Sequence, residues 1–273
     1  INKELALIEC GPESCLKHLK NEIKKIGEDV RNIKHVFLTH IHLDHAGAAW
    51  WFARNGANIY VHPFGKAHLI TPEKLIASAK IIYGKSMNKL WGNIEGIDEN
   101  KVIPIKDKEK IKINNVEIKA LHTPGHAKHH ISWVIGDSVF TGDVVGAKIN
   151  NGPLLPACPP PDINIEEWDK SLEVIKKENP NYLYFTHFGK FSYNEDEIIN
   201  LQNTLQEWLI WVKKNKNLNE TVQIEKFKGY IKKNLKSKFV DDQTIEQYCI
   251  ANPPYMSILG LKRVLMKKNY DKA

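Results

Sequence analysis

The chain has 273 residues, of which 42% are apolar and 26% are charged, a composition typical of a globular protein with a sizeable core. No apolar run approaches the roughly 20 residues of a membrane-spanning helix, and the first residues lack the charged-then-apolar pattern of a signal peptide. The net charge of +7 comes almost entirely from lysines interspersed with acidic residues, so we expect a solvated surface and neither a nucleic-acid nor a membrane partner.

The cysteines give no sign of a disulfide framework or of a zinc finger. Cys10, Cys15, Cys158 and Cys249 include no C-x-x-C pair, and their spacing matches no zinc-finger pattern. Reduced cysteines are typical of proteins in a reducing compartment. We therefore expect four free thiols in a cytoplasmic protein.

Helical and strand patterns alternate over the first third of the chain. In order, they predict a helix, a buried strand, a short helix, a strand and a helix, over residues 13–26, 33–40, 46–57, 58–62 and 71–84. Gly27 and Gly84 end the two longer helices, and Pro63 ends the second strand. This alternation is typical of a mixed α/β domain.

Two hairpin signals follow, and later the strand patterns give way to helical ones. Alternating apolar residues flank Asn114-Asn115 and later Gly136-Asp137. An amphipathic helix is predicted over 163–180 and an apolar strand over 182–187. From residue 194 the strand signals vanish and helical spacing continues to the end. We therefore expect an α/β catalytic domain over 1–193 and a helical C-terminal extension over 194–273 that packs on it.

Side chains that bind metals follow four of the predicted strands. The stretch THIHLDH places three histidines and an aspartate within six residues, 40 to 45. Because strands of one sheet structure end at a common rim, we expect these side chains to point toward one place. The predicted metal ligands are His40, His42, Asp44, His45, His126, Asp143 and His187.

This set is too large for one tetrahedral metal site. Imidazole and carboxylate together suit zinc, iron or manganese, and a carboxylate can bridge two cations. Two ions roughly 3.5–4 Å apart, with Asp143 between them, account for all seven side chains. We expect two divalent ions, with zinc as the first choice and iron or manganese as alternatives.

Over about residues 5–190 the chain resembles the metallo-β-lactamase superfamily. The resemblance rests on LIECGP, THIHLDHAG, HTPGHAKHH, FTGD and THFG, in that order. It implies a four-layer αββα sandwich with the metals at one edge between two sheets. By the family pattern, His126 and not His122 is the third histidine. One metal is then held by His40, His42 and His126, the other by Asp44, His45 and His187, and Asp143 bridges them.

Within that superfamily the motifs fit the glyoxalase II and lactonase branch. Asp143 stands where one class of lactamase has a cysteine ligand, and the short interval to His187 leaves no room for a nuclease's inserted domain. We therefore expect a dinuclear metal-dependent hydrolase of a small ester, thioester or lactone. A metal-bound hydroxide would attack the carbonyl carbon, and Asp44 would orient it and take up its proton.

Other functions stay open at this point. A mononuclear iron protein resembling persulfide dioxygenases, or another metal-binding redox protein, would use fewer of these ligands. A phosphodiesterase or nuclease of the same superfamily would use all of them. A homodimer formed through the helical extension is a further expectation.

Several residues near the motifs are given lesser roles. His62 is expected to be structural, whereas His122, His129 and His130 are candidates for orienting a ligand through a hydrogen bond. Cys158 lies in a proline-rich loop over 154–162 that could form a wall of the site. We do not expect Cys158 to be a nucleophile.

Overall fold

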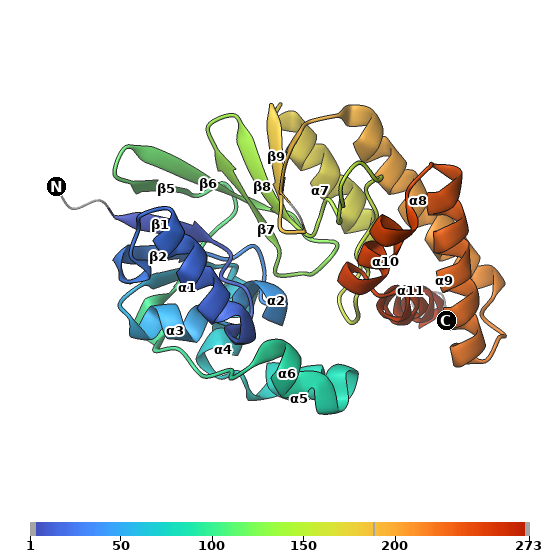
Figure 1. Ribbon diagram of the computed structural model, residues 1–273, viewed down its shortest axis with the longest axis horizontal. Coiled ribbons are helices and arrows are strands. Elements are labelled where there is room, and N and C mark those ends of the chain that lie inside the picture. The colour runs from blue at the N-terminus through green and yellow to red at the C-terminus, as the bar shows by residue number, and fades with distance from the viewer. Residues whose placement is uncertain (1–3, 188, 271–273) are drawn as a thin grey trace. The chain divides into compact units, whose positions relative to one another are not determined.

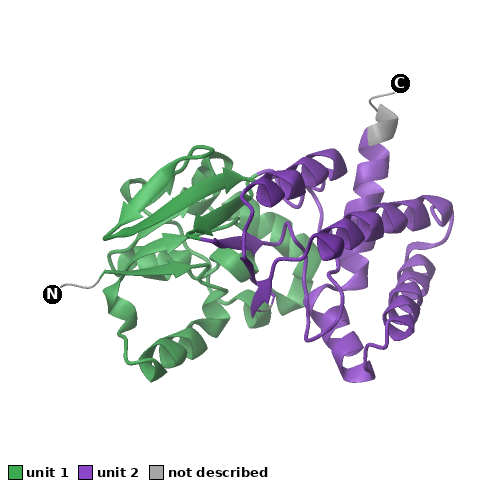
Figure 2. Cartoon of the chain, turned by 90° about the horizontal axis from the view of Figure 1, so that it is seen from above, with its two compact units in different colours: residues 1–122, 129–136 green, residues 123–128, 137–273 purple. Residues whose placement is uncertain are grey.

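The computed structural model describes residues 4–187 and 189–270. The chain forms two compact units, one of residues 1–122 with 129–136 and the other of residues 123–128 with 137–273 (Figure 2). Figure 1 labels the elements within them. The chain crosses between the units at the short segment that contains the TPGH motif, so each unit contributes part of the sequence pattern described above.

A four-stranded parallel sheet forms the centre of the first unit. Its strands lie in the order β1–β2–β3–β4, over Leu5–Ile8, Ile33–Phe37, Asn58–Val61 and Val102–Pro104. Parallel neighbours need long crossover connections, and helices supply them: α1, α2, α3, α4, α5 and α6, over Leu16–Lys25, Leu43–Ala46, Ala49–Arg54, Pro63–Ile70, Glu73–Tyr83 and Met87–Trp91. Val36, Ile59 and Phe52 are among the buried residues between sheet and helices.

An antiparallel set of strands completes the first unit. β5, β6 and β7, over Lys110–Ile113, Val116–His122 and Ile131–Ile135, pair in that order. Asn114 has a left-handed backbone (φ 52°) in the β5–β6 turn, which confirms the hairpin predicted there. The Trp133 indole N–H donates to the Leu38 carbonyl at 3.1 Å, which ties β7 to the chain just after β2.

The helices of this unit differ from expectation at several of their ends. The predicted first helix starts with a 3₁₀ turn, Glu13–Cys15, before α1. The short helix predicted over 46–57 is found as α3, and the one-turn helix α2 before it was not expected. α4 was not expected: Pro63 ends the strand as predicted but also begins a helix, because proline suits the first helical position.

The second unit begins with three more strands and one long helix. β8, over Ser138–Gly142, pairs in parallel with β9, over Tyr182–Phe185, and β9 pairs antiparallel with β10, over Gly189–Ser192. Between β8 and β9 lies α7, over Ile165–Lys177, which the periodicity predicted. The buried Trp168 on α7 donates its indole N–H to the Val144 carbonyl at 2.5 Å, so the helix is fixed to the chain just beyond Asp143.

Four helices follow β10 in the part of the chain that the structure describes. They are α8, α9, α10 and α11, over Glu195–Lys214, Glu220–Ser237, Asp242–Ala251 and Pro254–Tyr270. α8 packs on α7, where the Gln202 side-chain amide donates to Asp169 at 3.4 Å and Lys176 forms an ion pair with Glu195. The extension thus packs against earlier elements of its own unit. The division into domains at residue 194 stays a prediction, since this unit includes residues on both sides of it. None of the described helices is long and apolar enough to cross a membrane.

The two faces of α8 give a test of packing within the extension, where the Trp208 ring lies 5.1 Å from that of Phe227 on α9. Trp208 is 2% exposed and Ile210, on the same helix, is 51% exposed. We expect Trp208→Ala to lower the free energy of unfolding by about 3–5 kcal/mol, because it leaves a cavity. Ile210→Ala should change it by no more than about 0.5 kcal/mol. Equal effects of the two substitutions in urea unfolding would contradict the packing.

Candidate metal centre

The loop after β2 holds the dense cluster of polar residues found in the sequence. The backbone N–H of Leu38 donates to the Tyr60 carbonyl at 3.0 Å, so the loop starts in a fixed place beside β3. The loop then leads into the one-turn helix α2. The loop and α2 together carry four of the predicted ligands: His40 and His42 before the helix, and Asp44 and His45 within it. Two of these, His40 and His45, are fully buried.

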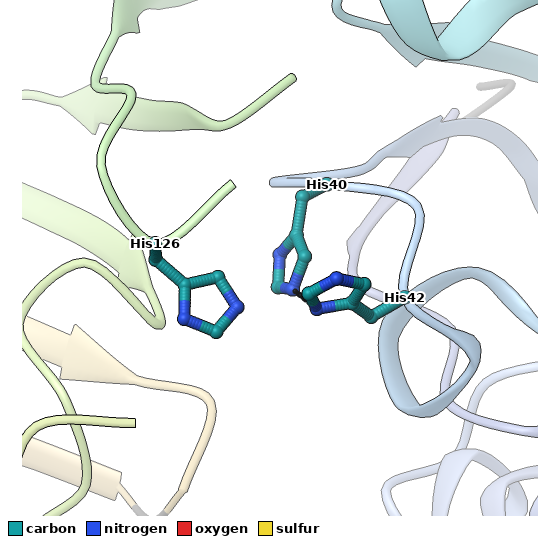
Figure 3. Close-up of side chains that lie close together, drawn as sticks. All are labelled: His40, His42 and His126. Carbon is teal, nitrogen blue, oxygen red and sulfur yellow. Dashed lines mark hydrogen bonds between the residues drawn. The ribbon is translucent and has the colours of Figure 1, made fainter. Parts of the chain in front are cut away.

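Both ring nitrogens of His40 face a partner. Its Nδ1 lies 2.9 Å from the Thr39 hydroxyl, and its Nε2 lies 2.9 Å from Nδ1 of His42 (Figure 3). Metal–nitrogen bonds to zinc are about 2.0–2.1 Å long. The approach of these two nitrogens therefore suits two ligands of a single ion, with Thr39 fixing the orientation of the His40 ring.

Glu9 holds His45 and the loop together. One carboxylate oxygen of Glu9 is hydrogen-bonded to Nδ1 of His45, and the other accepts the Thr39 backbone N–H at 2.6 Å. Glu9 has a left-handed backbone (φ 65°), which is unusual for a residue with a side chain. The interaction leaves Nε2 of His45, 3.5 Å from an Asp44 oxygen, as the nitrogen that could bind a metal.

Two further histidines lie against this loop. His129 accepts a long hydrogen bond of 3.5 Å from the Ile41 backbone N–H, and its ring stacks 6.2 Å from that of His40. The ring of His130 lies 5.1 Å from that of His40. Both are buried. They pack against the expected ligand His40 within the first unit, and their role in orienting a ligand stays a prediction.

His62 and His122 form a separate pair. Their rings lie 4.1 Å apart. Nδ1 of His62 accepts the Phe64 N–H at 3.1 Å and caps α4, and Nε2 of His122 lies 2.9 Å from the Ile105 carbonyl oxygen. Burial, reinforced by the neighbouring His122, lowers the pKa of His62 to about 4. His62 therefore has a structural role, as expected.

The second unit supplies three expected ligands: Asp143 and the two histidines that face it, His126 and His187. Nδ1 of His126 is 2.8 Å from the Ala157 carbonyl oxygen, and Nε2 is 3.6 Å from one oxygen of Asp143. Nε2 of His187 is 3.5 Å from the other oxygen of Asp143. One carboxylate thus faces two imidazoles through different oxygens, the arrangement expected of a bridging ligand.

The donor types fit divalent metal ions. Three groups of described side chains could hold an ion: His40, His42 and His126; His40, His45 and Asp143; and Asp44, His45 and His187. Together these groups contain all seven expected ligands, and none includes His122. Their nitrogen and carboxylate oxygen donors suit zinc, iron or manganese. The assignment of the seven residues to two ions stays a prediction.

The nearby cysteines are not placed to act as nucleophiles. Cys158 is completely buried, and burial raises the pKa of its thiol. Cys10 is also buried and donates its S–H to the His45 carbonyl at 3.2 Å. A nucleophilic cysteine needs an exposed, readily ionised thiol. The thiol of Cys158 is neither exposed nor readily ionised, which agrees with the expectation that it is not the nucleophile.

Comparison with known proteins agrees with the motifs. A sequence model of the metallo-beta-lactamase superfamily matches residues 1–187. The chain is 30% identical over 168 residues to the metallo-beta-lactamase fold-containing protein ST1585 of Sulfurisphaera tokodaii, covering 59% of this chain and 62% of that protein. It is 29% identical over 148 residues to hydroxyacylglutathione hydrolase GloC of Haemophilus influenzae, covering 52% of this chain and 62% of that one.

A solved structure shares the fold over most of its length. The chain superposes on the metallo-beta-lactamase family protein TTHA1429 of Thermus thermophilus with a TM-score of 0.70 and 17% identity, over 97% of this chain and 86% of that one. Mixed sheets flanked by helices, with further helices after them, therefore confirm the expected fold class. This chain spans only about three fifths of the length of the two sequence relatives, 62% of each.

The lowered pKa of His62 predicts a pH effect on stability. Between pH 6.5 and about 4 the unfolded chain binds a proton at His62 that the folded chain does not. The free energy of unfolding should therefore fall as the pH is lowered through this interval, by about 1–2 kcal/mol once solvent screening is allowed for. His62→Asn, which keeps a capping acceptor, should remove that part of the pH dependence. His18→Asn, at an exposed histidine, should keep it; equal profiles for the two variants would contradict the assignment.

Proposed function

The chain belongs to the metallo-beta-lactamase superfamily, and on that premise we propose that it is a metal-dependent hydrolase. The observation that carries the proposal is the way its histidines are held. His40, His45 and His126 each direct Nδ1 to an oxygen of the protein, which is the arrangement that prepares Nε2 for a metal. These residues lie in the motifs that define the family resemblance.

Two ions account for the whole ligand set. We assign His40, His42 and His126 to one ion and Asp44, His45 and His187 to the other, with Asp143 bridging. The two oxygens of Asp143, facing His126 and His187, support the bridging role. Seven donors exceed the four of a single tetrahedral site, which favours two ions over one.

The chemistry of hydrolysis follows from this assignment. Bound divalent ions would lower the pKa of a water molecule and polarise the carbonyl of the substrate. Asp44 is the residue of the loop that would orient the attacking water and take up its proton, since its carboxylate is partly exposed and next to His45. Glu9 and Thr39 would keep the histidine rings oriented throughout.

The substrate class is an ester, thioester or lactone. Relatives named hydroxyacylglutathione hydrolase support a carbonyl substrate of this kind, among them the GloC protein. A redox protein with a single iron would leave part of the ligand set without a role. A phosphodiesterase would use the same metals, and a panel of thioesters, lactones, aryl esters and phosphodiesters separates these functions directly.

The charged side chains of the helical extension are consistent with a small-molecule enzyme. Lysines of the helical extension form ion pairs with acidic side chains, such as Lys232 with Glu246 and Lys236 with Asp242. This supports a solvated surface without a nucleic-acid or membrane partner. All four cysteines are free, which supports a cytoplasmic location. A homodimer remains part of the proposal, to be tested by sedimentation.

Metal analysis tests the ligand assignment. We expect two divalent ions per chain in metal-replete protein, and His126→Ala should reduce this number because it removes a ligand. His122→Ala is the matched control four residues away: its ring bonds to the Ile105 carbonyl, so the metal content should be unchanged. One ion in the wild-type protein, or a loss with His122→Ala alone, would overturn the assignment.

Catalysis depends on Asp143 in this proposal. Asp143→Ala removes the bridging carboxylate, so one ion should bind weakly and the rate should fall on the order of a thousand-fold, equivalent to about 4 kcal/mol of transition-state stabilisation. Cys158→Ala should leave the rate nearly unchanged. Turnover should be measured with the best substrate of the panel, together with metal content. A covalent mechanism replaces this one if the cysteine variant is inactive and the aspartate variant active.

A further inference from the structure

One expected metal ligand is oriented by the main chain of a distant loop. Nδ1 of His126 lies 2.8 Å from the carbonyl oxygen of Ala157, and His126 is 1% exposed. A protonated Nδ1 donates to this carbonyl, so the bond fixes both the tautomer and the direction of the ring. The position of a single peptide group therefore sets where Nε2 of His126 points.

The loop that contains Ala157 has few bonds of its own. Prolines occupy positions 153, 156 and 159–161, and proline has no backbone N–H to donate. An antiparallel bridge between Ala147 and Leu155 joins it to the preceding chain. The loop must therefore be held by other parts of the protein if Ala157 is to stay in place.

The last two helices supply these contacts on both sides of Ala157. The side-chain amide of Asn252, at the end of α10, donates to the Pro156 carbonyl at 2.7 Å. Gly260 of α11 packs against the Cys158 carbonyl so closely that a Cβ there would lie 2.1 Å from the oxygen. Farther along, the Tyr248 hydroxyl donates to the Pro153 carbonyl at 2.7 Å.

The orientation of the Asn252 amide is itself fixed. Its oxygen lies 3.5 Å from the Ser257 hydroxyl, and its nitrogen faces Pro156. Both Asn252 and Ser257 are buried. A buried amide that loses its acceptor is left with an unsatisfied polar group, which is unfavourable, so the bond to the loop resists displacement.

We propose that Asn252 is a positioning residue for the metal ligand His126, acting through the adjoining Pro156–Ala157 peptide. Gly260 acts with it by holding the next carbonyl, that of Cys158. The helical extension thereby sets the affinity of the metal centre although it contributes none of the predicted ligands. This inference rests on the proposed function in one respect, that His126 binds a metal.

The test compares metal binding by two full-length variants. Asn252→Asp keeps the shape of the side chain but places an oxygen against the Pro156 carbonyl. We expect its zinc affinity, measured by competition with a chromogenic chelator, to fall about tenfold, within the range for residues that orient ligands. The visible absorption bands of the cobalt-loaded protein should also shift, because the imidazole changes direction.

Asn215→Asp is the matched control. Asn215 lies at the end of α8 in the same extension, and its side-chain amide also donates to a carbonyl, that of Trp211, at 2.9 Å. This hydrogen bond is of the same kind as that of Asn252 but does not involve the proline-rich loop. The zinc affinity and cobalt spectrum of the Asn215→Asp variant should therefore match those of the wild type. An equal loss in both variants would mean that general destabilisation is responsible, and would overturn the proposal.

Two other variants keep the test decisive. Gly260→Ala pushes on the Cys158 carbonyl and should weaken zinc binding in the same direction as Asn252→Asp. Tyr248→Phe removes the hydroxyl that donates to the Pro153 carbonyl and accepts the Ile149 N–H. It gives the same readout if the other variants do not fold, as judged by circular dichroism. Wild-type affinity and spectrum in every folded variant would overturn the proposal. Wild-type protein that binds no zinc or cobalt would instead overturn the proposed function.

Discussion

A histidine that binds a metal almost always has its second ring nitrogen held by another group, which sets its tautomer and the direction of its ring. Three of the expected ligands meet this condition in different ways: His40 through a hydroxyl, His45 through a carboxylate and His126 through a peptide carbonyl. Glu9 and Ala157 come from distant places in the chain, whereas Thr39 directly precedes its ligand His40. The end of β1 delivers Glu9, the end of β2 delivers Thr39, and the proline-rich loop delivers Ala157.

Glu9 illustrates how local strain can be retained for such a purpose. A non-glycine residue in the left-handed region costs on the order of 1 kcal/mol or more. Its carboxylate compensates by accepting from the Thr39 backbone and from His45 at once. The side chain of Glu9 thus reaches both partners from a strand end with an unusual backbone.

The sequence predicted the elements and the candidate ligands better than the contacts that hold them. Ligand types at strand ends and family motifs identified His40, His126 and Asp143, because residue type and position carry that signal. Apolar periodicity predicted α7 and the helical extension for the same reason. The boundary at α4 was missed, since Pro63 suits both the end of a strand and the start of a helix. The Ala157 carbonyl could not be found in this way, because a backbone atom leaves no mark on residue type.

The contact between His126 and the Ala157 carbonyl responds to mutation differently from the other two, because a backbone atom supplies it. A hydroxyl or carboxylate partner can be lost by one substitution at Thr39 or Glu9, whereas no substitution at position 157 deletes a peptide carbonyl. Heritable variation can reach this contact only by moving the loop, through residues such as Asn252 that are almost a hundred positions away. Substitutions in the C-terminal helices can therefore adjust the orientation of one ligand, His126, by small steps, while the metal-binding motifs themselves stay intact.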